Sequence, residues 1–324
     1  MDIADLMIKA AWLYHVEGLT QAQIAERMNL TRRRVNELLS EALADGLVRV
    51  TFTSPLTENV RLEGELCEAF ELVEAKVVST PGDPALLHAV LGRAAAAFLD
   101  RVIEAHQPRS IGVGWGSTLR HTVHHMTRRQ MPHLQIFSMM GGLTRGAEIN
   151  TFDIVRSFAE VLDARCHYFA APIYADSEVS RNLIVEQSVF KELLSKAASV
   201  DLSFLSVGDL TGNSLQVRYG LPATVNIQDL ISAGAVGDLL GHYLDDHGQP
   251  TSHPLNSQAI SPDLETYRAI GTRIIASGGI HKRSIIGAAL RGKLATALVT
   301  DADTARWLLD RRVNAQAATL PDAR

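Results

Sequence analysis

Apolar side chains recur at helical spacing within residues 19–43, LTQAQIAERMNLTRRRVNELLSEAL. The spacing predicts two short helices, one over about 21–28 and one that begins after residue 31. The inward positions that would press these helices together are Ile24, Ala25, Met28, Leu30, Val35 and Leu38. The small side chain of Ala25 suits a close helix crossing.

Polar residues mark where each of these helices begins. Thr20, with Gln23 three residues on, has the spacing of a reciprocal capping box, and Thr31 can cap the second helix. Asn29 stands at the turn, and Asn tolerates the left-handed backbone conformation better than any residue except Gly. Two capped helices joined by a tight turn predict a helix-turn-helix.

The outer face of the second helix carries the residues that can read DNA. With its apolar residues turned inward, Arg32, Arg33 and Asn36 lie at the outer N-terminal end, and Arg34 lies beside the phosphates, next to the cap Thr31. Arg can bond guanine bidentately and Asn can do the same to adenine, which suits the major groove. The alternative is an ordinary helical hairpin with a solvated basic face.

The flanking segments complete this N-terminal unit. Residues 4–17 have helical spacing, with Leu6, Ala10, Leu13 and Trp12 or Tyr14 on one face, and Gly18 ends the run. Residues 47–53, LVRVTFT, alternate like a short strand, either a wing or an edge strand. Ser54-Pro55 breaks this pattern, so we expect a linker at residues 54–58.

The rest of the chain alternates helical patterns with short apolar runs. The helical patterns are residues 84–104, 151–163 and 282–292, and the apolar runs are residues 75–80, 110–115, 134–140, 166–174, 201–208, 273–278 and 296–300. Strands that are apolar throughout and alternate with helices indicate a parallel sheet covered on both faces. We therefore expect a helix-turn-helix domain over residues 1–53 and a larger Rossmann-like α/β domain over residues 59–324.

Composition and charge narrow the class of protein. The 324 residues are 46% hydrophobic and 21% charged, with a net charge of -5, so the protein is not coated in basic surface. DNA contact must then come from a local cluster, with affinity raised by two-fold symmetry. No membrane span or signal peptide is visible, and Cys67 and Cys166 are isolated, which predicts neither a disulfide nor a zinc site. We expect a cytoplasmic protein without cofactors.

Three glycine-rich loops follow predicted strands, where open α/β sheets bind their ligands. The first runs from Gly112 to Thr118, but Ser117 replaces the third glycine of the dinucleotide-binding fingerprint. The second is Gly141-Gly142, with Asn150 just beyond. Taken singly, each loop could be glycine-rich for steric reasons alone.

The third loop, residues 277–282, is the most suggestive of the three. Gly278 and Gly279 would leave free amides at a helix N-terminus, and Lys282 follows them, which together could hold a phosphate-sized anion. Asp238, in GAVGDLLG, could accept hydrogen bonds from sugar hydroxyls or could serve only as a turn residue. His121 and His125 have a metal-binding spacing without a third ligand, so we expect no metal.

The residues resemble the SorC family of bacterial transcriptional regulators over nearly the whole chain. The resemblance rests on the helix-turn-helix segment, on IGVGWGSTL, MGG and GAVGDLLG, and above all on SGGIHKRSIIGAALRGKLATALVTDADTA. It implies an effector domain similar in fold to sugar-phosphate isomerases, a homo-tetramer, operator DNA as partner, and a phosphorylated sugar or polyol as effector.

The resemblance also implies roles for individual residues. Ser117 and Thr118 would touch the effector, and Asn150 would bond one of its hydroxyls or its phosphate. Asp238 would bond hydroxyls, and Lys282 would hold the phosphate. The glycines lining the effector would be Gly116, Gly141 and Gly142. Gly278 and Gly279 are further effector-binding candidates because of their place at a helix N-terminus. Met140 stands where some relatives have an arginine, so we expect a monophosphate or an unphosphorylated polyol rather than a bisphosphate.

Three functions compete on these grounds. The first is a regulator, a repressor of a carbohydrate or polyol catabolic operon, whose effector shifts the balance between states of different DNA affinity. The second is a sugar-phosphate isomerase or Schiff-base aldolase with a DNA-binding head, using Lys282 and Asp238. The third is a constitutive DNA-binding protein whose large domain only oligomerises. No acid/base pair lies within one short motif, so we expect no catalytic residues.

Overall fold

The structure is a computed structural model that describes residues 3–48, 57–143 and 150–319. The chain divides into two compact units, Met1–Thr57 and Glu58–Arg324. Of the strand expected at residues 47–53 and the linker expected at 54–58, residues 49–56 lie outside the described part. Thr57 and Glu58 belong to a helix.

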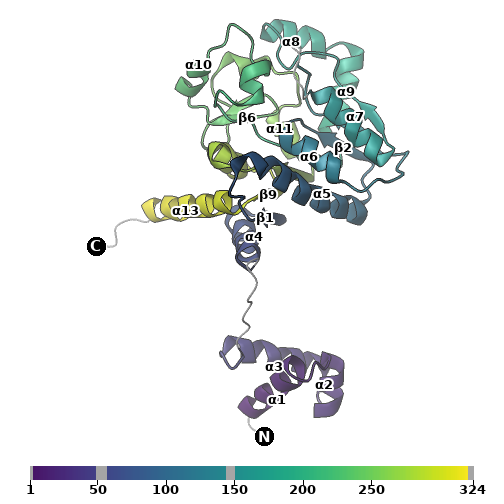
Figure 1. Ribbon diagram of the computed structural model, residues 1–324, viewed down its shortest axis with the longest axis vertical. Coiled ribbons are helices and arrows are strands. Elements are labelled where there is room, and N and C mark those ends of the chain that lie inside the picture. Colours follow the sequence, from purple (N-terminus) through teal and green to yellow (C-terminus); the bar gives the residue numbers. More distant parts are fainter. Residues whose placement is uncertain (1–2, 49–56, 144–149, 320–324) are drawn as a thin grey trace. The chain divides into compact units, whose positions relative to one another are not determined.

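The first unit contains three helices, α1 (Ile3–His15), α2 (Gln21–Met28) and α3 (Arg32–Ala44) (Figure 1). The predicted capping box is confirmed, because Thr20 accepts from Gln23 N at 3.4 Å and Thr20 N donates to Gln23 Oε1 at 2.9 Å. Asn29 adopts the left-handed conformation with φ 54°, and Thr31 accepts from Arg34 N. The sequence therefore fixes both helix starts and the turn between them.

The core of the first unit is built as expected except on α1. The buried side chains are Met7, Ala10, Ala11, Leu13, Ile24, Ala25, Val35, Leu38, Leu39 and Ala42. The expectation that Trp12 or Tyr14 points inward is wrong, because both are exposed. The small side chains of Ala10 and Ala11 pack into this core instead.

A seven-stranded sheet forms the centre of the second unit, with strand order β1-β9-β8-β5-β2-β3-β4 and every neighbouring pair parallel. The strands are β1 (Glu74–Val78), β2 (Ser110–Val113), β3 (Gln135–Ser138), β4 (Arg165–His167), β5 (Leu202–Leu205), β8 (Thr272–Ala276) and β9 (Ala297–Asp301). Each overlaps one of the seven apolar runs in the sequence. The predicted parallel sheet is confirmed.

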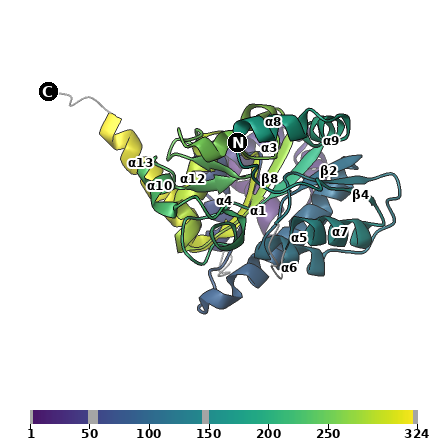
Figure 2. The same ribbon diagram turned by 90° about the horizontal axis from the view of Figure 1, so that it is seen from above.

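Helices cover both faces of this sheet (Figures 1 and 2). One face packs on α5 (Leu87–His106), α6 (Ser117–His125) and α7 (Thr151–Leu162), and the other on α4 (Thr57–Phe70), α9 (Ser188–Ala198), α11 (Leu264–Arg268), α12 (Arg283–Arg291) and α13 (Ala302–Thr319). Successive strand residues alternate between the two cores: Phe204 packs with the first group and Leu205 with the second. Both faces are buried, which is why the strands are apolar throughout.

The remaining elements lie between β4 and β8 or precede helices. They include an antiparallel hairpin, β6 (Gly237–Leu239) and β7 (His242–Leu244), and two helices, α8 (Glu178–Val185) and α10 (Ile227–Ser232). Short helical turns are η1 (Pro84–Leu86), η2 (Gln216–Gly220), η3 (Pro254–Ser257) and η4 (Ile280–Lys282). No helix in the described ranges has a long enough apolar stretch to cross a membrane.

Candidate functional site

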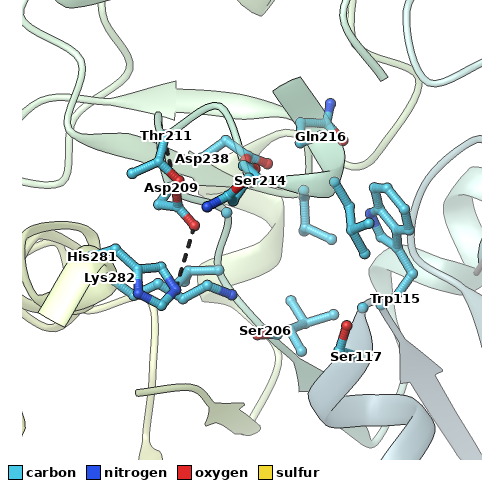
Figure 3. A pocket seen from close by; sticks show the side chains of 18 of the residues that line it. Trp115, Ser117, Ser206, Asp209, Thr211, Ser214, Gln216, Asp238, His281 and Lys282 are labelled. Atoms are coloured by element: carbon cyan, nitrogen blue, oxygen red, sulfur yellow. Dashed lines mark hydrogen bonds and ion pairs between the residues drawn. The ribbon is translucent and has the colours of Figure 1, made fainter. Parts of the chain in front are cut away.

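A cavity of about 400 Å³ opens beyond the carboxyl ends of β2, β5 and β8 (Figure 3). The chain runs from β2 toward β3 and β4 in one direction and from β5 toward β8 in the other, so β2 and β5 flank the point where strand order reverses. Ligands of open α/β sheets bind at such a point. The cavity is therefore the first candidate for a binding site in the second unit.

The turn after β2 forms one wall of the cavity, through Gly114, Trp115, Gly116 and Ser117. Gly116 has φ 125° and precedes α6 without a side-chain cap. The backbone amides of Ser117 and Thr118 have no acceptor within the described residues, so this helix N-terminus is open to an anion. Figure 3 shows Trp115 and Ser117 on the side of the pocket opposite His281.

Thr118 lies behind the wall rather than in it. Its side chain is 2% exposed, and its Oγ1 lies 3.0 Å from Nδ1 of His88, which does line the cavity. Burial, with the positive charge of Lys282 second, lowers the pKa of His88 to about 4. Thr118 thus orients a neutral imidazole toward the cavity, and direct contact between Thr118 and an effector stays a prediction.

The turn after β8 does not supply the amide cradle that the sequence suggested. Gly279 N donates to Asp301 Oδ2 at 2.8 Å and to Thr304 Oγ1 at 3.1 Å. A Cβ on Gly278 would lie 2.3 Å from the same Asp301 oxygen. Neither glycine lines the cavity. An anion cradle that uses the Gly279 amide is therefore wrong, and this loop contributes the side chains of His281 and Lys282 instead.

Lys282 is the one lysine or arginine among the described residues that line the cavity. No carboxylate of the described residues forms an ion pair with its amine, although Asp209 and Asp238 are near enough to raise its pKa. Burial has the larger effect and lowers the pKa of Lys282. Nε2 of His281 lies 3.8 Å from Oδ2 of Asp209, and burial lowers the pKa of His281 as well. A ligand with an anionic or hydroxyl oxygen would give the amine a partner.

Asp238 reaches the cavity through the β6–β7 hairpin. Gly208 N donates to Asp238 O at 3.0 Å and Asp238 N donates to Gly208 O at 2.9 Å, which ties the hairpin to the loop after β5. Oδ2 accepts from Gly241 N at 3.1 Å, while Oδ1 has no donor within the described residues. Burial raises the pKa of this carboxyl to about 6.

The second glycine loop lies outside the cavity wall. A Cβ on Gly141 would lie 2.1 Å from Pro172 O, and one on Gly142 would lie 2.4 Å from the ring of Phe152. Asn150 bonds both backbone groups of Leu143 at 3.2 Å. Close packing explains this glycine pair, so the effector contacts of Gly141, Gly142 and Asn150 stay predictions that the cavity does not support. Of this loop's neighbours, buried Met140 does line the cavity.

Several lining residues were missed from the sequence. They are His88, Trp115, Leu205, Ser206, Val207, Gly208, Asp209, Thr211, Asn213, Ser214, Leu215, Gln216, Leu240 and His281. Most belong to residues 205–216, which begin at the last residue of the buried strand β5 and include many small and polar side chains. The rule that ligands bind beyond strand ends, applied to this strand, could have found the run. His88 belongs to α5 and reaches the site only through tertiary packing.

The lining can bind a small polar molecule. Hydroxyls, amides and carboxylates surround one ammonium group, and Trp115 offers an aromatic face among them. Such a mixture of an apolar platform and few placed polar groups is typical of small-molecule sites. The open helix N-terminus of α6 and Lys282 favour an oxyanion, and Asp238 and Asp209 favour hydroxyl donors.

In the first unit, the expected DNA-reading residues lie together on α3. Arg32, Arg33 and Asn36 are exposed, and Arg34 is partly buried. Arg33 pairs with Glu37 at 3.0 Å and Arg34 with the same carboxylate at 3.1 Å. Arg32 has no ion-pair partner among the described residues, so its guanidinium is the one available without breaking an ion pair.

The side-chain carbonyl of Asn36 already accepts a hydrogen bond within the first unit. Gln21 Nε2 donates to Asn36 Oδ1 at 3.1 Å, across from the start of α2. Bidentate recognition of adenine needs both the carbonyl and the NH₂ group of Asn36. This bond between two exposed side chains must therefore open, or share its acceptor, before Asn36 can read adenine.

Comparison with known proteins matches both units. The sugar-binding domain family matches residues 54–310, and region 4 of sigma-70 matches residues 8–45. The chain is 30% identical over 306 residues to the erythritol catabolism regulatory protein EryD of Brucella abortus (strain 2308), covering 94% of this chain and 96% of that relative.

Two further relatives extend this comparison. The deoxyribonucleoside regulator of Bacillus subtilis (strain 168) is 28% identical and covers 94% of this chain and 97% of its own length. The crystal structure of the full-length sorbitol operon regulator SorC from Klebsiella pneumoniae superposes with a TM-score of 0.72 at 26% identity, covering 95% of this chain and all of that one. These relatives are transcriptional regulators rather than enzymes.

Proposed function

The chain belongs to the SorC- and DeoR-type sugar-binding domain family of transcriptional regulators, and from that premise we propose that it controls a carbohydrate or polyol catabolic operon in response to an effector bound in the cavity. The single observation that carries the proposal is the position of the cavity at the strand-order reversal, lined by Ser117, Asp238 and Lys282. The enzymatic alternative is not supported, because the relatives are regulators.

In this proposal α3 reads operator DNA. Arg32 and Asn36 contact base edges, and Thr31 holds the helix start. Arg33 contacts bases or phosphates once it leaves Glu37, and Arg34 does so once it leaves Glu37 and Glu41. Residues 1–50 carry six Lys or Arg against seven Asp or Glu, so a single head is a weak DNA binder, and two-fold symmetric copies in a homo-tetramer supply the affinity. We assign the protein as a cytoplasmic repressor.

The effector in this proposal is a small polyol or a sugar monophosphate. Asp238 accepts hydrogen bonds from hydroxyl groups, while Lys282 and the amides of Ser117 and Thr118 receive the oxyanion or a terminal hydroxyl. The erythritol-related name of one relative and the sorbitol-related name of another favour this ligand class. No arginine is found among the described residues that line the cavity, which favours a monophosphate or an unphosphorylated polyol over a bisphosphate.

A thermal-shift screen tests the effector site. The full chain is heated with free and phosphorylated tetritols, pentoses and hexitols, and a ligand at about 100 times its dissociation constant should add roughly 2.7 kcal/mol to the free energy of unfolding. Lys282→Ala should lose the response. Lys196→Ala is the matched control, because Lys196 lies exposed on α9 and pairs with Glu192.

The outcomes separate the competing functions. A shift lost in Lys282→Ala but kept in Lys196→Ala supports the proposed site. A shift that survives Lys282→Ala moves the ligand away from this lysine. If no carbohydrate stabilises the protein, the result would instead favour a constitutive DNA-binding protein whose large domain only oligomerises.

A further inference from the structure

Asp301, the last residue of β9, is buried and joins three segments that meet beside the cavity. Its side chain is 1% exposed. Oδ2 accepts from Gly279 N at 2.8 Å and Thr304 Oγ1 at 2.7 Å, and Oδ1 accepts from Thr304 N at 3.0 Å and Thr80 Oγ1 at 3.1 Å. Both oxygens are fully used, and neither lines the cavity.

We propose that Asp301 is a positioning residue, which fixes the turn carrying His281 and Lys282 into the cavity and links that turn to the N-terminal end of α4. The inference rests on the proposed function for its biological meaning, since α4 is the first helix that follows the DNA-binding unit in the sequence. The link itself is a property of the folded chain and can be tested without DNA or effector.

On the cavity side, packing and hydrogen bonds other than those of Asp301 also restrict the turn that carries His281 and Lys282. Gly279 has φ 96°, and a Cβ on it would lie 2.9 Å from Leu87, so the backbone is closely packed. Lys282 N donates to Gly279 O at 3.0 Å, which sets the lysine one short helical turn beyond the glycine. The hydrogen bond between Gly279 and Asp301 therefore determines where the Lys282 side chain begins.

On the other side, the loop after β1 carries the link to α4. Thr80 Oγ1 donates to Asp301 and accepts from Asp303 N at 3.0 Å. The neighbouring Ser79 accepts from the buried Asn59 of α4, at 3.2 Å. The loop is thus hydrogen-bonded to β9, to the start of α13 and to α4.

An ion-pair path runs parallel to this loop. Arg306 of α13 pairs with Asp303 at 2.7 Å and with Glu58 of α4 at 2.8 Å. Figure 1 shows α4, β1, β9 and α13 as neighbours in the second unit. A ligand that pulls Lys282 changes the geometry at Gly279 and Asp301, and both paths transmit that change to the first turn of α4.

The position of Lys282 can be measured through the reactivity of its amine. Reductive methylation by formaldehyde and cyanoborohydride, followed by peptide mass spectrometry, gives the pH midpoint of Lys282 in the full chain. Asp301→Asn cannot accept with both side-chain atoms, so the turn loosens and the amine gains water. Because burial lowers the pKa of Lys282, the midpoint should rise when the amine gains water.

Milder variants keep this test independent of folding defects. Thr80→Val should move the Lys282 midpoint in the same direction. Thr80→Ser keeps the hydroxyl group, so its Lys282 midpoint should equal that of the unmodified protein. Thr127→Val is the control, since Thr127 likewise donates its hydroxyl to an aspartate, Asp100, at 2.8 Å. An unchanged midpoint in both Asp301→Asn and Thr80→Val would overturn the inference.

A double-variant cycle tests the link to α4. Lys282→Ala and Asn59→Ala share no direct hydrogen bond, and changes at unconnected sites normally add. We expect their effects on Tm not to add, whereas Lys282→Ala and Thr127→Val should add. Additive effects in the first pair would overturn the link. Coupling without any carbohydrate effect on DNA affinity would keep the link and reject the proposed function.

Discussion

Gly208 and Asp238 exchange two backbone hydrogen bonds, at 3.0 and 2.9 Å, and a Cβ on Gly208 would lie 2.0 Å from Asp238 Oδ1. These two hydrogen bonds hold the buried carboxylate of Asp238, in the β6–β7 hairpin, against the loop that follows β5. Any side chain at residue 208 must therefore displace the carboxylate or the loop.

Gly208→Ala should lose most effector-induced stabilisation. Overpacking at such a site typically costs about 1–3 kcal/mol of unfolding free energy. Gly212 belongs to the same loop, and a Cβ there meets nothing within 4 Å. Gly212→Ala should therefore be neutral or stabilising, by about 0.4–1 kcal/mol. Urea denaturation with and without ligand measures both, and equal behaviour of the two variants would contradict the packing argument.

The contribution of Asp238 to the free energy of unfolding should fall as pH rises. Burial raises its pKa from the ordinary 3.8 to about 6, so between these values the folded state keeps a proton that the unfolded state has lost. The carboxyl's contribution therefore declines by about 3 kcal/mol over that window and then stays level.

Asp238→Asn removes this dependence and keeps a carbonyl that can accept from Gly241 N. Its stability relative to the unmodified protein should rise between about pH 4 and pH 6, as measured by urea denaturation at several pH values. A difference that is the same at every pH would contradict the assigned environment of Asp238.

Glu37 should restrain the basic face of α3. It pairs with both Arg33 and Arg34, which lower the pKa of its carboxyl. Glu37→Gln should release Arg33 and leave Arg34 with Glu41, at 3.4 Å, as its ion-pair partner. Affinity for all DNA sequences should then rise alike, and the salt dependence should steepen. Glu26→Gln, at an exposed position of α2, is the control for the charge change.

Arg32 should behave as a base-reading residue. Its guanidinium has no ion-pair partner among the described residues, so Arg32 can bind DNA without first breaking an ion pair. Arg32→Ala should lose about 1–3 kcal/mol of operator affinity and relax specificity at one position. A loss that is uniform across sequences, with a flatter salt slope, would make Arg32 a phosphate contact instead.

Thr31 should determine how firmly α3 begins. Thr31 Oγ1 accepts from Arg34 N at 3.2 Å, and removing such a cap costs about 0.5–2 kcal/mol. Thr31→Ala should speed amide hydrogen exchange in the first turn of α3 in the full chain. Thr31→Ser keeps the hydroxyl and should exchange like the unmodified protein. Fast exchange in both variants would assign the effect to the threonine methyl group.

Local chemistry made much of the fold predictable. Thr20, Asn29 and Thr31 specify their caps and turn through short-range hydrogen bonds, and the apolar strands specify a sheet buried on both faces. The β6–β7 hairpin was not predicted, because its strands are short and its register depends on the bridge between Gly208 and Asp238. Trp12 was misplaced because the helical spacing allowed two inward faces.

The site was only partly predictable for a related reason. Sequence position locates a loop at a strand end, but whether its amides face a cavity depends on distant partners. The Gly279 amide donates to Asp301, which lies 22 positions further along the sequence. Gly141 and Gly142 are closely packed against Pro172 and Phe152. His88 enters the site because Thr118 holds its ring, a contact that no local pattern reveals.

The most direct test of the proposed function is fluorescence anisotropy of the full chain on operator DNA selected from a random pool, with and without the carbohydrate that stabilises the protein. We expect a saturating effector to change operator affinity by at least about fivefold, and Lys282→Ala to bind the same DNA without responding. An operator affinity that is identical with and without a bound effector would contradict the proposed function.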